Sequence, residues 1–171
     1  MDSKLREPLG DIADCGLPVA LEAMGERWSF MILRAAFNGV HHFEEFQSEL
    51  GIARNILSNR LARLVEHDIL VREVMVADRR KVLYRLTDKG SELLPTMVAL
   101  RQWGERWDLG CLSSPVLVDA RDLQPVRAVA LLAHDGRVLT KHDLSWMHAE
   151  EVVPIGSKSA NIPPITTAEA A

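Results

Sequence analysis

Two short predicted helices separated by a single tight turn constrain the fold of this 171-residue chain more than any other feature. Apolar residues recur at helical spacing over 43–50, Gly51 ends that segment, and a second helix is predicted over 53–67. Two short helices joined by a tight glycine-containing turn are typical of a helix-turn-helix unit. The chain is therefore expected to build a small helical core around this pair.

Two further helices are predicted before this pair. The first spans 17–24, with Asp14 as its N-cap and Pro18 in its first turn. The second spans 26–37 and is ended by Asn38-Gly39, because glycine readily adopts the left-handed conformation that stops a helix.

A β-hairpin is predicted after the pair, from strands over 69–76 and 81–86 with a basic tip between them. Thr87 is expected to cap a long helix over 88–109, which Pro95 should kink or break. This order of elements is that of a winged helix-turn-helix. The predicted fold class is α+β: a mainly α winged helix-turn-helix with a basic hairpin wing, a long C-terminal helix and a small β-rich appendage.

The appendage is predicted from three β-branched segments, at 116–118, 126–133 and 137–140. Asp135-Gly136 is a hairpin signal between the last two of them. Apolar packing of Val126, Val129, Leu131 and Val138 is expected to hold it together.

Net charge is misleading until it is divided along the chain. The total of −4 and an isoelectric point near 5.9 argue against nucleic acid as a partner. Residues 51–90, however, hold nine Lys or Arg against five Asp or Glu, whereas the rest holds eleven against nineteen. The predicted helix-turn-helix and wing are therefore basic within an acidic chain.

The helix predicted over 53–67 has one apolar and one polar face. Asn55, Ser58 and Asn59 are the candidate base readers, since amides and hydroxyls can pair with base edges in the major groove. The candidate phosphate contacts are cationic: Arg54, Arg60 and Arg63 on this helix, and Arg79, Arg80 and Lys81 at the wing tip. The alternative for the helix is an ordinary solvated face, and the alternative for the wing tip is a charged turn that aids solubility.

Several motifs in order make the sequence resemble the HxlR family of bacterial winged-helix regulators. They are Cys15, Gly25-Glu26-Arg27-Trp28, Ile32-Leu33-Arg34, Phe43-Glu44-Glu45-Phe46, the run 51–61, the run 84–90, Leu93-Leu94-Pro95 and Gln102-Trp103-Gly104. The resemblance covers roughly residues 15–109.

The resemblance implies a cytoplasmic homodimeric transcription regulator whose helices near 17–24 and 88–107 form the dimer interface. The residues themselves also favour a partner, because the last helix has more apolar surface than one small domain needs. The candidate interface residues are Leu17, Leu21, Leu94, Val98, Trp103 and Trp107. The alternative is that this face packs on the chain's own appendage. A two-fold dimer predicts a pseudo-palindromic operator with half-sites about 10 bp apart or a multiple of that.

These assignments divide the chain into five predicted segments. They are an N-terminal arm and dimerisation helix (1–24), a winged helix-turn-helix DNA-binding domain (25–90), a dimerisation helix (91–111), a β-rich appendage (112–151) and a flexible tail (152–171).

The leading hypothesis for the function is transcription regulation through sequence-specific binding to double-stranded DNA. The alternative is a winged-helix protein-interaction module without specific DNA binding.

Cys15 matches a cysteine with which several HxlR-type regulators sense oxidants, quinones or aldehydes, so the resemblance implies a candidate redox sensor. A helix N-terminus favours the thiolate that such chemistry needs, whereas the nearby Asp11 and Asp14 disfavour it. A buried structural thiol is the alternative. A small-molecule or oxidant effector therefore stays open, and Cys111 is interpreted as incidental.

Several functions are expected to be absent. No nucleophile–base or paired-carboxylate pattern indicates an enzyme, and no cofactor motif is present. Some relatives carry a zinc ribbon in the appendage, but 116–139 has no cysteine here, and His134 with Asp135 cannot complete a tetrahedral site, so no metal is expected. No apolar run reaches the length of a membrane helix, and a cytoplasmic location is expected.

Overall fold

A computed structural model of the protein describes residues 15–74, 82–147 and 152. The chain divides into two compact units, and the larger one takes in residues 10–130 with all of its described helices. The described part of the other unit is 131–147 and residue 152.

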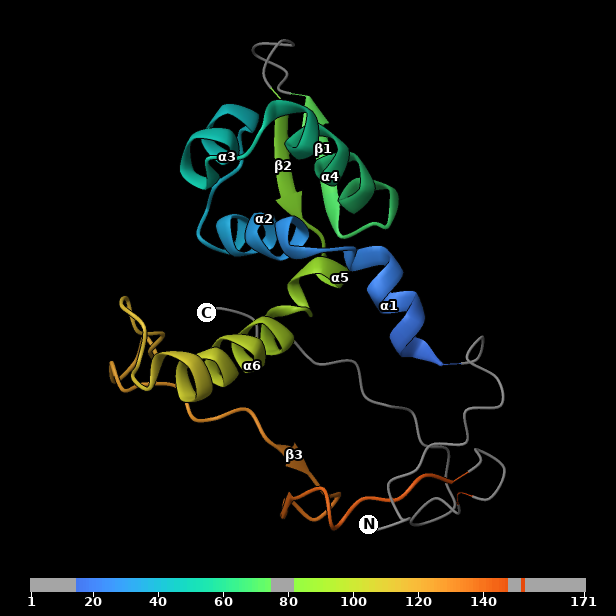
Figure 1. The fold of residues 1–171 in the computed structure, drawn as a ribbon, viewed down its shortest axis with the longest axis vertical. Coiled ribbons are helices and arrows are strands. Elements are labelled where there is room, and N and C mark those ends of the chain that lie inside the picture. The colour runs from blue at the N-terminus through green and yellow to red at the C-terminus, as the bar shows by residue number, and fades with distance from the viewer. Residues whose placement is uncertain (1–14, 75–81, 148–151, 153–171) are drawn as a thin grey trace. The chain divides into compact units, whose positions relative to one another are not determined.

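The first four helices follow the sequence-based expectation closely (Figure 1). They are α1 (Gly16–Met24), α2 (Arg27–Phe37), α3 (Phe43–Leu50) and α4 (Arg54–Glu66). Gly51, at φ 59°, ends α3 in the left-handed conformation, and the turn to α4 needs only three residues. The helix-turn-helix prediction is confirmed.

The predicted cap of α1 is wrong. The N-cap position of α1 is Cys15, one residue after Asp14, which lies outside the described residues. The extended backbone of Cys15 begins the helix without a side-chain hydrogen bond to it. The sequence rule chose the nearest good capping side chain, whereas this helix begins without one.

The hairpin consists of β1 (Leu70–Val74) and β2 (Val82–Leu86), paired antiparallel from Leu70↔Leu86 to Val74↔Val82. β1 begins one residue later than predicted, and the predicted strand positions 75, 76 and 81 lie outside the described residues together with the rest of 75–81. A single bridge from His42 to Leu83 adds a third, minimal strand to this sheet. The hairpin is thereby joined to the start of α3, with the Tyr84 amide donating to the His41 carbonyl at 2.8 Å.

The predicted long helix is divided into α5 (Asp88–Ser91), α6 (Leu94–Gly104) and a π-helical turn, η3 (Glu105–Leu109). Thr87 caps α5 as expected, because its Oγ1 accepts a hydrogen bond from the Gly90 amide at 3.0 Å. The interruption falls before Pro95, which occupies the first turn of α6, where its missing N–H costs nothing. Pro95 therefore starts a new helix after a break, which is the second of the two outcomes expected for it.

The core lies where α2, α3 and α4 meet the hairpin. Its fully buried large side chains are Ile32, Leu33, Phe46, Leu57, Leu61, Leu64 and Leu70. The ring of Phe46 meets Tyr84 of β2 edge-on, with centroids 6.5 Å apart. This packing fixes α4 from behind and leaves its opposite face free to act.

The appendage holds much less β-structure than predicted. In the larger unit, the segment after η3 has one isolated bridge, from Val118 to Pro125. In the other unit, β3 (Leu131–Leu132) and β4 (Val138–Leu139) form a two-residue hairpin closed by Gly136 at φ 81°. The expected packing is also wrong, since Val126, Val129, Leu131 and Val138 are all exposed. Without an apolar face to bury, β-branched residues do not extend the pairing.

Gly90 should be the glycine at which the addition of one methyl group destabilises the fold most. A Cβ on Gly90 would lie 2.1 Å from the carbonyl oxygen of Ile69, and this backbone is held by Thr87. We expect Gly90→Ala to lower the free energy of unfolding by about 1–3 kcal/mol, measured by urea denaturation.

Gly104→Ala is the matched control, because a Cβ there meets nothing within 4 Å at the end of α6. Alanine in a helix is favoured over glycine by about 0.5–1 kcal/mol, so this variant should be neutral or more stable. Equal stability of the two variants would contradict the close approach at Gly90.

Candidate nucleic-acid interface

The buried side of α4 determines which of its residues face outward. Leu57, Leu61 and Leu64 recur at three- and four-residue spacing and are at most 1% exposed. Since side chains at this spacing share one helical face, residues half a turn away must point to solvent. The polar positions of α4 are therefore presented by the core packing itself.

The three candidate base readers lie on this outward face. Asn55, Ser58 and Asn59 are all exposed, and Ala62 continues the same face without bulk. The sole acidic residue of α4 is Glu66, at its last position. An accessible strip of amide and hydroxyl groups, with small residues and no carboxylate beside it, is suited to a base edge in a groove.

Arg54 occupies the first position of α4 and is exposed. Its guanidinium carbon lies 4.8 Å from the centroid of the Phe43 ring, close enough for a cation–π interaction. The ring restricts the arginine without neutralising it. A cation is thus held at the start of the polar face, where a phosphate contact was predicted.

The other two predicted phosphate contacts on α4 have partners inside the protein. Arg60 forms an ion pair with Glu26, and its side chain is only 22% exposed. Arg63 donates from Nε to the backbone carbonyl of Glu22 at 3.0 Å, with a second bond from its guanidinium to the same oxygen. Both side chains connect α4 to the α1–α2 junction instead of extending over its polar face.

The predicted wing contacts Arg79, Arg80 and Lys81 lie outside the described residues. On the described strands, Arg72 and Arg85 are exposed, and Arg85 pairs with Glu73 at 3.1 Å from Nε to the carboxylate. The hairpin is anchored near α3 because the ring Nδ1 of His42 lies 3.2 Å from the Val82 carbonyl.

Glu45 stabilises the start of α3 in a way that the sequence did not suggest. Its carboxylate accepts hydrogen bonds from the amides of His42 at 3.1 Å and His41 at 3.3 Å. These amide bonds, His42 first, lower the pKa of Glu45. The usual signal of a capping box is Ser or Thr three residues earlier, and His42 stands there instead.

The candidate dimer residues lie on α1, α6 and η3, and most of them form exposed apolar surface. Trp103 is 60% and Trp107 69% exposed, Leu17 64% and Leu21 54%, and no residue of α6 is buried. Leu94 is also exposed, and Val98 is half-buried. The alternative, that the appendage packs on this face, holds in part within the larger unit, since Val98 shares a cavity with Leu117, whereas both tryptophans stay exposed.

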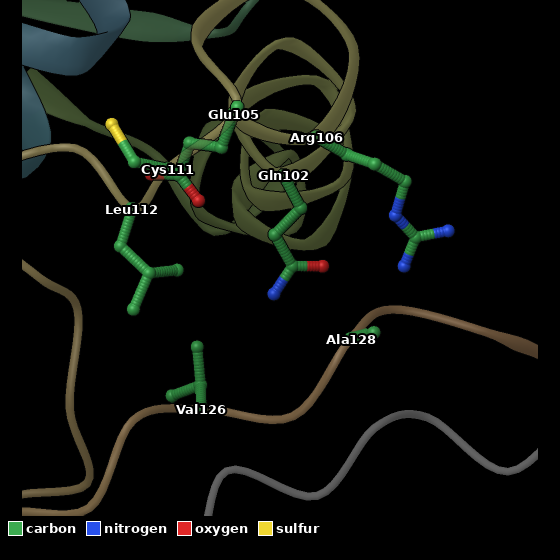
Figure 2. A pocket seen from close by; sticks show the side chains of 8 residues that line it. Gln102, Glu105, Arg106, Cys111, Leu112, Val126 and Ala128 are labelled. Atoms are coloured by element: carbon green, nitrogen blue, oxygen red, sulfur yellow. The ribbon is translucent and has the colours of Figure 1, made fainter.

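The segment after η3 contacts α6 through Arg101 and through Gln102. The Gln102 amide donates to the Arg127 carbonyl at 3.0 Å and accepts from the Val129 amide at 2.8 Å. Gln102 also lines a cavity of about 440 Å³. In Figure 2 its side chain projects beside Arg106 and opposite Val126 and Ala128. Cys111, an exposed residue that is not part of a disulfide, also lines this cavity.

Cys15 is half-buried and is not part of a disulfide. Within 15–74 and 82–147, no group of three or more His, Cys, Asp or Glu is arranged to hold a metal ion. In the same ranges, no helix has the length and apolar character to cross a membrane.

Comparison with known proteins adds independent information. Residues 23–109, just over half of the chain, match the model of the HxlR-like helix-turn-helix family. The uncharacterized HTH-type transcriptional regulator Rv3095 of Mycobacterium tuberculosis is 44% identical over 88 residues, which are 52% of this chain and 56% of that protein. The match therefore spans little more than half the length of this curated relative.

Solved structures extend the likeness beyond the family segment. PA1607, described as a proposed transcription factor, is 40% identical with a TM-score of 0.74, covering 80% of this chain and 96% of that one. The oxidized form of the redox regulator HypR is 29% identical with a TM-score of 0.50, covering 54% and 96%. The fold likeness thus includes much of the region after α6.

Proposed function

The chain belongs to the HxlR-like helix-turn-helix family of transcriptional regulators, and from this premise we propose that it binds a specific double-stranded DNA sequence as a homodimer. The observation that carries the proposal is the exposed polar face of α4, fixed from behind by three buried leucines. In this reading α4 enters the major groove, and the wing tip contacts backbone or minor groove.

Within this proposal the cations of α4 have different roles. Arg54, exposed at the start of the helix, is the phosphate contact. Arg60 and Arg63 instead set the position of α4, because their bonds to Glu26 and to the Glu22 carbonyl join it to the preceding helices. This replaces the sequence-based assignment of both residues to phosphate.

The homodimer is supported by the apolar stripe on α1, α6 and η3. Exposed tryptophans at two positions one helical turn apart are unusual on a monomer and are enriched in protein interfaces. A two-fold pair of α4 helices would read two half-sites, about 10 bp apart or a multiple of that.

Redox control through Cys15 is a second proposal, supported by its place at the start of α1 and by the likeness to HypR, a redox regulator. The α1 helix is joined to α4 by the bonds from Arg63 to the Glu22 carbonyl. A shift of α1 on oxidation of Cys15 would therefore be transmitted through these bonds to α4, the helix proposed to read DNA.

Selection from random-sequence duplexes tests the main proposal. We expect enrichment of a pseudo-palindromic site, bound by the purified protein with an affinity that falls steeply as salt rises. The alternative, a protein-interaction module, predicts no enriched sequence at physiological salt. An enriched site without internal symmetry would contradict the homodimeric reading alone.

A further inference from the structure

A second cavity, of about 500 Å³, lies between the C-terminal end of α2 and the start of α6. Arg34, Phe37 and Asn38 line it from α2, Met97 and Val98 from α6, and Leu117 from the segment after η3. Its volume is within the range of about 300–1,000 Å³ that is usual for small-molecule sites. It is distinct from the polar face of α4.

One wall of this cavity is held by a polar network around Arg101. The Arg101 Nε donates to the Ser113 hydroxyl at 3.0 Å, and its guanidinium also bonds to the Pro115 carbonyl. Glu105 pairs with Arg101 at 2.9 Å and accepts from the Ser113 amide at 3.2 Å. The charge of Arg101 is therefore compensated within the protein, and residues 113–115 are fixed against α6.

Arg34 is different, because no ion pair joins its guanidinium to any residue in the described ranges. None of the described residues that line this cavity is acidic. The rest of the lining is mainly apolar, with Phe37, Met97 and Leu117 facing the same space. One cationic end and an apolar body are the features that an amphipathic anion requires.

We propose that this cavity binds an effector with a carboxylate on an apolar body, such as an aromatic acid. Arg34 would receive the carboxylate through a bidentate charge-assisted contact, and the apolar body would lie against Met97 and Phe37. The effect of this ligand on operator binding rests on the proposed function, whereas the binding itself does not.

Isothermal titration calorimetry without DNA tests the proposal, with 1-naphthoate as the probe and 1-naphthalenemethanol as its neutral counterpart. We expect the acid to bind about tenfold more tightly than the alcohol, as one hydrogen-bonded charge contributes. Arg34→Gln should abolish this preference, and Arg34→Lys should keep only part of it, because lysine retains the charge but not the bidentate geometry. Arg106→Gln, in the cavity of Figure 2, is the matched control and should change nothing.

Three results would overturn the proposal. They are equal binding of acid and alcohol, loss of the preference in Arg106→Gln alone, and no binding of either compound. In the last case, a changed sedimentation coefficient of Arg34→Gln would assign the cavity to a second copy of the chain. Binding of 1-naphthoate by a protein that selects no DNA would refute the proposed function and leave this inference standing.

Discussion

Replacing Asn55 and Asn59 together by alanine should remove sequence-specific DNA binding while the protein stays folded. Both side chains are exposed on α4, so their loss leaves the core unchanged. A good bidentate contact to a base contributes about 1–3 kcal/mol of discrimination, so two of them predict a loss of specificity of roughly 30-fold or more. The measurement is the affinity for the selected site relative to a scrambled duplex, by fluorescence anisotropy.

Arg54→Gln provides the contrast, since a phosphate contact carries no sequence information. This variant should weaken binding to both duplexes alike and reduce the salt dependence by about one ion. The asparagine variant should instead keep its salt dependence and its weak binding to the scrambled duplex. Undiminished specificity of the asparagine variant would exclude this face of α4 as the reading surface.

The sequence predicted the helix-turn-helix well because local signals and packing agree there. Phe43, Phe46 and Leu50 mark one face of α3, and Gly51 stops it at the residue where the structure does. The same three-to-four spacing in α4 separates its buried leucines from Asn55 and Asn59. A helical wheel is sufficient to predict which side chains face solvent where burial of one face sets the orientation of the helix.

The roles of Arg60 and Arg63 could not be predicted in this way. The wheel places Arg63 on the polar face and Arg60 at its boundary, and only the tertiary structure brings Glu26 and the Glu22 carbonyl to them. A backbone carbonyl leaves no signature in the sequence. The cavity beside Arg34 is similar, because it needs α2, α6 and the 113–117 segment together.

In the appendage the sequence predicted more β-structure than the structure has. Valine and leucine at positions such as Val129 and Leu131 favour strands locally, but both side chains remain exposed. Strand propensity mainly reflects packing against neighbours, so it overestimates pairing where no core forms. The Asp135-Gly136 turn was predicted correctly because its signal is local to the backbone.

The proposed homodimer should dissociate to monomers when Trp103→Asp is combined with Trp107→Asp. Both indoles are more than half exposed in the single chain, as expected for side chains that a second copy would cover. Tryptophans buried in an interface each contribute about 2 kcal/mol or more, and a two-fold dimer buries each of them twice, so the two changes should raise the dimer dissociation constant by about a thousandfold or more. Sedimentation velocity across a concentration series measures this directly.

Leu132→Asp is the control, because Leu132 is also 60% exposed but lies on β3, outside the stripe. It should leave the dimer intact.

The monomeric tryptophan variant should also lose most of its affinity for the full operator, since each half-site is then bound independently and the effective concentration of the second α4 is lost. A tryptophan variant that stays dimeric would show that the dimer interface does not depend on this part of α6 and η3. A monomer with undiminished operator affinity would instead show that one α4 is sufficient for recognition.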